Sequence, residues 1–368
     1  MQYDWIATTA FGLEGLVRRE LNGLGLDARA DNGFVRFHAS AEEAFDANLW
    51  LRTADRVMLL AAEDRAETFD ELFRLTRSVP WHEILPRNAS FPVSGKCARS
   101  RLMSVSDCQA IVKKAVAEEL MAWYHMSWCD ESGEKYPIQV SLHGDVARLS
   151  VDASGEALNR RGYRTWNGEA PIRETLAAAM VSLSPWREGQ PLHDPCCGTG
   201  TLLIEAAFRA SDRAPGLYRD FLLEKWRLTD QNETAKRRNL AKARFTPAKL
   251  PPISGSDLDG AALELAARHI RQARLDGLIT LSQQDLRQLR LDKNAPLFLT
   301  NPPYGERLSD RKTCEKLYRS LHELQARHEG SALCAISAHP GFERAYGARA
   351  KKKRRLYNGR LECEFMVF

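Results

Sequence analysis

The chain has 368 residues, of which 44% are hydrophobic, enough for two or three packed domains. Its formal net charge of +5 is too small by itself to indicate a nucleic-acid partner. No apolar run approaches the roughly 18 residues that cross a bilayer. The N-terminus also lacks the pattern of a secretory signal, so we expect a cytoplasmic protein with no membrane partner.

Residues 1–60 alternate between strand and helix patterns. The expected elements are strands at 3–9, 34–37 and 57–61 and helices at 13–21 and 41–53. Gly23 and Gly25 end the first of these helices. This order in so short a stretch predicts a ferredoxin-like α+β domain.

Residues 61–160 form a second predicted domain. A strand at 91–93 leads into a basic loop at 95–105, and a helix is expected to begin at Ser106 with Gln109 as its capping partner. The alternating segments 138–142 and 146–151 predict paired strands, because His143-Gly144-Asp145 can turn between them.

Residues 165–368 alternate strand and helix as a doubly wound, mostly parallel sheet does, so the fold class is α/β after the two α+β domains. The expected elements are strands at 190–194, 252–257, 278–284, 296–300 and 332–337, and helices at 171–183, 199–210, 259–275 and 311–327. Residues 352–368 predict a hairpin that turns at Asn358-Gly359. An insertion at 211–250, rich in Arg, Lys and Trp, separates the first two strands of this sheet.

Basic residues gather in three clusters. They are Arg87, Lys96, Arg99, Arg101, Lys113 and Lys114; then Arg160, Arg161 and Arg164; and then Arg349, Lys351, Lys352, Lys353, Arg354 and Arg355. Any one cluster is as well explained by solvated loops and helix faces. All three together favour a polyanionic partner.

A glycine turn carries the strongest local signal. In the segment Asp194-Pro195-Cys196-Cys197-Gly198-Thr199-Gly200-Thr201, an acid ends a strand, two glycines turn, and a helix begins. Such a turn lets a ligand approach the backbone closely. The third glycine of the dinucleotide fingerprint is replaced by Leu203, which disfavours a pyrophosphate cofactor, and the acid suits a cationic amino-acid group.

Two further acids follow the next two strands. Asp257 is placed to accept the hydroxyls of a ribose and Asp285 to meet an adenine amine. Each acid alone is more often a helix N-cap. Three acids at successive strand ends beside a glycine turn favour one shared ligand site, because ligands of open α/β sheets lie there.

The segment Asn301-Pro302-Pro303-Tyr304 follows another predicted strand. An exocyclic base amine is a poor nucleophile, but the Asn301 side-chain oxygen and the Pro302 carbonyl can accept its two hydrogens and free its lone pair. The two prolines hold those acceptors rigid, and Tyr304 offers a flat face for a base swung out of its stack. With a sulfonium as methyl donor the leaving group is neutral, so positioning is most of the catalysis. The alternative is an ordinary turn after a strand.

These residues resemble the THUMP-domain RNA guanine-N2 methyltransferases, above all the bacterial 23S rRNA guanine-N2 methyltransferases and their stand-alone relatives. The likeness covers nearly the whole chain. The matching segments are Asp194–Thr201, Asn301-Pro302-Pro303-Tyr304-Gly305-Glu306-Arg307-Leu308, Leu158–Arg164, Ala170–Ala179 and Tyr357–Cys363. Cys196 departs from the family, which usually has an aromatic residue there.

The resemblance implies S-adenosylmethionine as cofactor, RNA as partner (rRNA before tRNA), and a THUMP RNA-binding domain at 61–160. The expected cofactor contacts are Thr175, Asp194, Pro195, Cys196, Gly198, Gly200, Thr201, Asp257, Asp285 and Asn301, and the catalytic residues are Asn301, Pro302, Pro303 and Tyr304. The expected RNA contacts are Lys96, Arg99, Arg101, Lys113, Lys114, Arg160, Arg161 and Arg164. The eight cysteines contain no Cys-x-x-Cys pair, so we expect reduced thiols and no metal site.

Two other functions stay open. The same tetrad also occurs in adenine-N6 methyltransferases, which act on RNA or DNA. A non-catalytic RNA-binding protein could keep the fold, although RNA binding alone does not require the tetrad at 301–304.

Overall fold

The computed structural model describes residues 1–164, 172–291, 295–304 and 308–368. The chain forms two compact units, each assembled from separate segments. The first unit contains residues 1–9, 17–158 and 220–239, and the second contains residues 10–16, 159–219 and 240–368. Ala170, Pro171 and residues 305–307, which carry part of the family resemblance, lie outside the described residues.

The first unit is built on one seven-stranded sheet of order β2-β3-β1-β4-β7-β6-β5. Its strands are β1 (Tyr3–Thr8), β2 (Ala28–Asp31), β3 (Phe34–Ala39), β4 (Arg56–Arg65), β5 (Val93–Ala98), β6 (Ile138–His143) and β7 (Val146–Asp152). The predicted domain boundary at residue 60 falls inside β4. This strand pairs with β1 through Arg56–Leu59 and with β7 through Met58–Arg65, so it belongs to both predicted domains.

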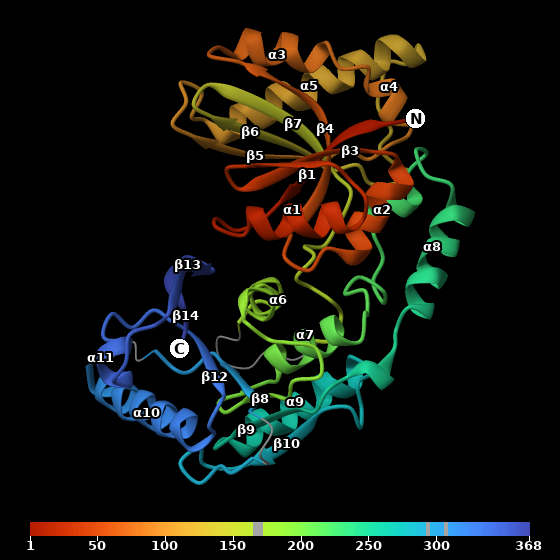
Figure 1. The fold of residues 1–368 in the computed structure, drawn as a ribbon. Helices are drawn as coiled ribbons and strands as arrows, with labels where there is room; N and C mark the ends of the chain where they lie inside the picture. Colours follow the sequence, from red (N-terminus) through yellow and green to blue (C-terminus); the bar gives the residue numbers. More distant parts are fainter. Residues whose placement is uncertain (165–171, 292–294, 305–307) are drawn as a thin grey trace. The chain divides into compact units, whose positions relative to one another are not determined.

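Helices cover both faces of this sheet. They are α1 (Glu14–Gly23), α2 (Ala41–Trp50), α3 (Phe69–Arg77), α4 (Trp81–Ile84) and α5 (Val105–Tyr124). Helices α1 and α2 lie on one side, and α3 and α5 on the other (Figure 1). The predicted start of α5 is wrong: Ser104, not Ser106, is the N-cap, and its hydroxyl accepts from the backbone N–H of Asp107. The predicted strand at 91–93 begins only at Val93, because Pro92 has no N–H to give to a sheet.

Part of the insertion belongs to the first unit. The insertion contains the 3-10 turn η1 (Leu222–Lys225) and the helix α8 (Gln231–Ala243), which lie mostly within residues 220–239, and the 3-10 turn η2 (Pro247–Lys249), which belongs to the second unit. Trp226 stacks on Tyr136 with ring centroids 4.9 Å apart and donates through Nε1 to the Lys135 carbonyl at 3.0 Å. Phe221 meets Phe45 edge-on at 5.9 Å. Both inserted aromatic rings are buried, so residues 220–239 are part of the core of the first unit.

The second unit holds the doubly wound sheet that the sequence predicted, with strand order β10-β9-β8-β11-β12-β14-β13. Its strands are β8 (Leu192–Asp194), β9 (Ile253–Asp257), β10 (Thr280–Gln283), β11 (Leu297–Thr300), β12 (Ala332–Ser337), β13 (Lys352–Asn358) and β14 (Leu361–Val367). The five strands from β10 to β12 are parallel, and the β13–β14 hairpin adds antiparallel strands. The hairpin turns through Gly359 and Arg360, because Asn358 pairs directly with Leu361.

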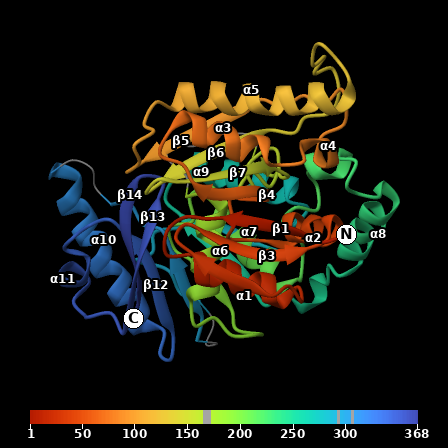
Figure 2. The ribbon, with the colours of Figure 1, turned by 90° about the horizontal axis from the view of Figure 1, so that it is seen from above.

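Successive residues of β11 point alternately into two hydrophobic clusters of this unit. Leu297 and Leu299 of β11 pack with α6 (Glu174–Leu183), α7 (Thr201–Ala210) and α9 (Gly260–Gln272), whereas Phe298 packs with α10 (Leu308–Arg327) and α11 (Phe342–Tyr346). Figure 2 shows α10 and α11 on one side of the strands and α6 and α7 on the other. The first strand, β8, lies between β9 and β11. The chain adds β9 and β10 on one side of β8 and then crosses over to add β11 and β12 on the other side, so the strand order switches beside the carboxyl end of β8. Open α/β sheets bind ligands at such a point.

Among the helices in the described ranges, none has both the length and the apolar character needed to span a bilayer. All eight cysteines lie in the described ranges, and none of them forms a disulfide bond.

Candidate active site

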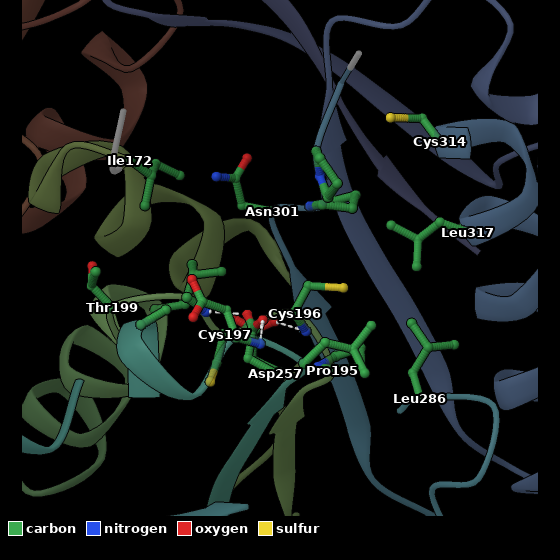
Figure 3. A pocket seen from close by; sticks show the side chains of 18 of the residues that line it. Ile172, Pro195, Cys196, Cys197, Thr199, Asp257, Leu286, Asn301, Cys314 and Leu317 are labelled. Carbon is green, nitrogen blue, oxygen red and sulfur yellow. Dashed lines mark hydrogen bonds between the residues drawn. The ribbon is translucent and has the colours of Figure 1, made fainter. Parts of the chain in front are cut away.

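A cavity of about 1220 Å³ opens at the carboxyl ends of the parallel strands of the second unit. Its walls come from the turns after β8, β9, β10 and β11, from one face of α10, and from the end of the β13–β14 hairpin (Figure 3). Pockets for one small ligand usually measure roughly 300–1,000 Å³. This cavity is therefore large enough for a nucleoside-sized ligand and a second planar group.

Close packing fixes the glycine turn after β8. Gly200 has φ of +80°, a conformation that costs other residues energy, and it begins α7. A Cβ on Gly255 of β9 would lie 2.5 Å from Leu203 and 2.8 Å from Cys197, so only glycine lets this strand approach the turn so closely. His269 of α9 contacts the Thr199 carbonyl at 3.1 Å through Nδ1. The turn is thus held in shape by the protein itself.

Asp194 is the buried acid at the start of this turn. It is 1% exposed, and its Oδ1 accepts from the Cys196 N–H at 3.0 Å. Burial, together with the nearby charge of Asp257, raises the pKa of Asp194 to about 7. A cationic ligand group beside Asp194 would favour its ionised form.

Asp257 ends β9 and is anchored by both oxygens. Oδ2 accepts from the Gly198 N–H at 2.8 Å and Oδ1 from the Asp259 N–H at 3.0 Å. A carboxylate oxygen has a second lone pair, so both remain able to accept from a diol. Asp259, in contrast, caps α9 by accepting from Ala261.

Asp285 also lines the cavity but is already engaged. Its carboxylate accepts from the backbone N–H and the guanidinium of Arg287, and these hydrogen bonds lower the pKa of Asp285. If Asp285 also meets an adenine amine, as the sequence predicts, its carboxylate would accept from that amine and from Arg287 at the same time.

The tetrad after β11 faces the same cavity. Asn301 lies beside Ile172 and points into the open part of the cavity (Figure 3). Its Oδ1 accepts from the hydroxyl of Tyr304. Burial raises the pKa of this hydroxyl, so Tyr304 stays a proton donor. An amide oxygen has two lone pairs, so Asn301 can still accept one more hydrogen.

A residue that the sequence did not single out supports the tetrad. Tyr318 of α10 is fully buried and donates through its hydroxyl to the Pro303 carbonyl at 2.8 Å. Its ring packs on Phe342 with centroids 4.2 Å apart. No local sequence pattern marks such a residue, because the contact joins positions 15 apart in the chain.

Known families match all three parts of the chain. The family described as "RMKL-like, methyltransferase domain" matches residues 161–366, an "RlmL ferredoxin-like domain" matches 4–58, and a THUMP domain matches 66–152. The chain belongs to the RMKL-like methyltransferase family. The family resemblance read from the sequence is confirmed.

Curated relatives differ in how much of their length this methyltransferase spans. The putative RNA methyltransferase YpsC of Bacillus subtilis is 38% identical over 369 residues, which is 100% of this chain and 96% of the relative. The ribosomal RNA large subunit methyltransferase K/L of Methylococcus capsulatus is 35% identical over 389 residues, again 100% of this chain but 51% of the relative. The chain therefore spans about half the length of the K/L proteins.

Solved structures agree with the fold. A predicted N6-adenine-specific DNA methylase from Listeria monocytogenes is 38% identical with a TM-score of 0.96, covering 100% of this chain and 96% of that one. A putative methyltransferase solved as a complex with SAH is also 38% identical, with a TM-score of 0.95 and coverage of 100% and 98%. SAH is the demethylated form of S-adenosylmethionine, so the cofactor expected from the sequence is confirmed for the family.

The cavity fits that cofactor. Eight of the expected cofactor contacts line it: Asp194, Pro195, Cys196, Gly198, Thr201, Asp257, Asp285 and Asn301. A Cβ built on Gly198 would meet no atom within 4 Å, which leaves space beside the turn. Thr175 and Gly200 do not line the cavity: Thr175 is buried within α6, and Gly200 shapes the turn.

The expected RNA contacts lie in differing surroundings. Lys96, Arg99, Arg101, Lys114 and Arg160 are exposed. Several are already ion-paired: Arg101 with Glu67, and Lys113 with Glu131 at 2.5 Å. These positions, of which Arg160 belongs to the second unit and the others to the first, remain a proposal for RNA contact.

Two arginines of the second cluster serve the protein interior. The expectation for Arg161 is wrong, because its side chain is 2% exposed and pairs with the buried Glu205 at 3.4 Å. Arg164 is mostly buried, pairs with Glu174 at 3.4 Å and donates to the Thr201 hydroxyl at 2.5 Å. The sequence shows only that these residues are positively charged. That does not separate an arginine in an internal ion pair from an arginine on the surface.

Proposed function

We propose that this chain transfers a methyl group from S-adenosylmethionine to the exocyclic N2 of a guanine in structured RNA, with large-subunit rRNA as the expected substrate. The observation that carries the proposal is the presence of Asn301 in the same cavity as Asp194 and Asp257. A base-amine acceptor and the glycine turn thus line the same cavity. The RNA-methyltransferase relatives and the THUMP domain support RNA as the substrate class.

The residues of the chain have separable roles in this reaction. When bound, the cofactor supplies an electrophilic methyl group on a sulfonium. Asp194 faces the cationic amino-acid end, and Asp257 accepts the ribose hydroxyls. Asn301 Oδ1 and the Pro302 carbonyl accept the two hydrogens of the base amine, which localises its lone pair on nitrogen. Tyr304 holds the Asn301 acceptor, and Tyr318 holds the Pro303 carbonyl next to the Pro302 acceptor, so the protein contributes orientation more than proton transfer.

A digest to nucleosides tests the proposal. The full chain is incubated with labelled S-adenosylmethionine and with rRNA and tRNA that lack the modification, and the RNA is then hydrolysed. We expect label in N2-methylguanosine, with more of it from 23S rRNA than from tRNA. Absence of N2-methylguanosine from every RNA would overturn the proposal.

Adenine-N6 methylation is the second candidate. The structure similar to this chain from Listeria monocytogenes carries a name of that kind, and the tetrad suits either amine. The same digest separates the two, because adenine methylation places the label in N6-methyladenosine, or in its deoxy form when DNA is supplied.

A further inference from the structure

Two sequence segments that the catalytic proposal leaves unused lie on one hairpin. They are the basic cluster at 349–355 and the family-like segment at 357–363. Strand β13 pairs with β14 from Lys352 opposite Val367 to Asn358 opposite Leu361. β13 is also the last strand of the sheet order, so one of its edges has no neighbouring strand in this sheet.

The first half of β13 carries positive charge that the protein only partly neutralises. Lys353 pairs with Glu343 and with Glu364, and Arg355 pairs with Glu362. Lys351 and Lys352 are exposed and form no ion pair within 4.0 Å with any side chain in the described ranges. Lysines on an edge strand also prevent pairing with another chain, so charge alone does not show a binding role.

The other end of the hairpin lies at the catalytic cavity. Asn358 and Leu361 line the cavity that holds Asn301 and the glycine turn. Asn358 and Cys363 lie close enough to Tyr304 to affect the pKa of its hydroxyl. The strand rises about 3.3 Å per residue, so it runs roughly 20 Å from Lys352 to this wall of the cavity.

That layout matches a nucleotide strand with one base turned into a pocket. The phosphates along the rest of the strand then lie outside the pocket and need cations, whereas the extracted base meets polar groups inside it. The amide of Asn358 offers both a donor and an acceptor to a base edge. No acidic residue of the hairpin lines the cavity.

We propose that the β13–β14 hairpin is an RNA-binding element of the catalytic unit. Lys351 and Lys352 hold phosphates farther along the RNA strand that carries the target nucleotide, and Asn358 contacts the edge of the target base. The proposal rests on the proposed function and adds a substrate contact outside the THUMP domain.

A pair of double variants tests the phosphate contacts. In the full chain, Lys351→Ala/Lys352→Ala should weaken binding of 23S rRNA fragments roughly tenfold and lower the slope of log K against log salt by about 1.5. The matched control, Lys242→Ala/Lys249→Ala, removes two exposed lysines of the same unit and should bind as the wild type does. Affinity for SAH should be unchanged in both. Equal RNA affinities and salt slopes for the two double variants would overturn the proposal, as would a wild-type chain that binds no RNA.

Asn358→Ala tests the base contact. We expect methyl transfer to fall at least several-fold at saturating cofactor, while SAH affinity and melting temperature stay at wild-type values. Asn358→Ser checks whether a shorter polar group restores part of the rate. Wild-type transfer rates in Asn358→Ala would remove this residue from the proposal.

Failure of the hairpin can be told apart from failure of the proposed function. If the wild type makes N2-methylguanosine and the hairpin variants behave like their control, only the hairpin is wrong. If the wild type methylates no RNA, the proposed function fails, whichever way the binding comparison falls.

Discussion

The turn after β8 and the turn after β11 form the two sides of the cavity, and they are held in different ways. The glycine turn is fixed by backbone hydrogen bonds, by Asp257 and by the close approach of Gly255. The tetrad is held by two tyrosine hydroxyls, on Asn301 and on Pro303. The difference indicates a preformed cofactor site beside an acceptor site whose geometry depends on a few side-chain hydrogen bonds.

Asn301→Ala should have the largest effect, because it removes the acceptor that orients the base amine. Loss of one such preorganised group typically costs about 10²–10³-fold in kcat. The measurement is methyl transfer to rRNA at saturating cofactor, with SAH affinity measured by calorimetry. A parallel loss of SAH affinity would show that the two turns are not independent.

Asp194→Asn should affect the cofactor side instead. Loss of a charged hydrogen bond to the amino group of SAH predicts roughly 10- to 100-fold weaker SAH binding. In the wild type the pKa of Asp194 is about 7, so below that pH the carboxyl is protonated in the free protein. SAH affinity should therefore fall as pH decreases below 7, by up to about tenfold per unit, and level off above it.

The Asn variant provides the control for this pH profile, since it cannot ionise. Its SAH affinity should be flat where that of the wild type changes. Identical profiles in the two proteins would argue that Asp194 does not face the cationic group.

Tyr318→Phe should lower kcat roughly tenfold, because the Pro303 carbonyl loses a partly buried hydrogen bond of about 1 kcal/mol or more. Tyr346→Phe is the matched control: Tyr346 is buried in the same hydrophobic cluster, and its hydroxyl donates to Gln325 instead. Both variants should lose similar stability in urea unfolding. Equal kcat values for the two would reduce Tyr318 to a structural role.

Tyr304→Phe should have the smallest effect, about threefold in kcat. The flat ring remains for stacking, and Asn301 loses only one of two possible partners. Tyr304→Ala is the comparison, and it should fall much further because the stacking face is lost. If Tyr304→Phe is as inactive as Tyr304→Ala, the hydroxyl and not the ring is the important group.

The sequence predicted the sheet of the second unit well because its signals are local. Apolar strand segments followed by Asp194, Asp257 and Asn301 identify strand ends without any tertiary information. β2 was not predicted, since Ala28–Asp31 is short, polar and mostly exposed. Helix α3 was also overlooked, although Thr68 and Glu71 form a capping box that the sequence displays.

Residues whose role depends on a distant partner could not be assigned from the sequence. Arg161 carries the positive charge expected of an RNA contact. Its actual partner is Glu205, which is 44 positions away in the chain. Tyr318 and His269 support the two turns from helices that the sequence marks only as amphipathic. Asn358 stood in a recognised family segment, but its place on the cavity wall required the coordinates.

Each unit is built from chain segments that are interrupted by segments of the other unit, and this limits which truncated chains can fold. A truncated chain starting at residue 159 would retain Phe221 and Trp226 but lose the Phe45 and Tyr136 rings that they pack on. It would also lose Leu13 and Leu16, which are buried in the hydrophobic cluster of the second unit. A soluble catalytic fragment therefore needs replacement of these exposed aromatic side chains and a substitute for residues 10–16, not a single cut between domains.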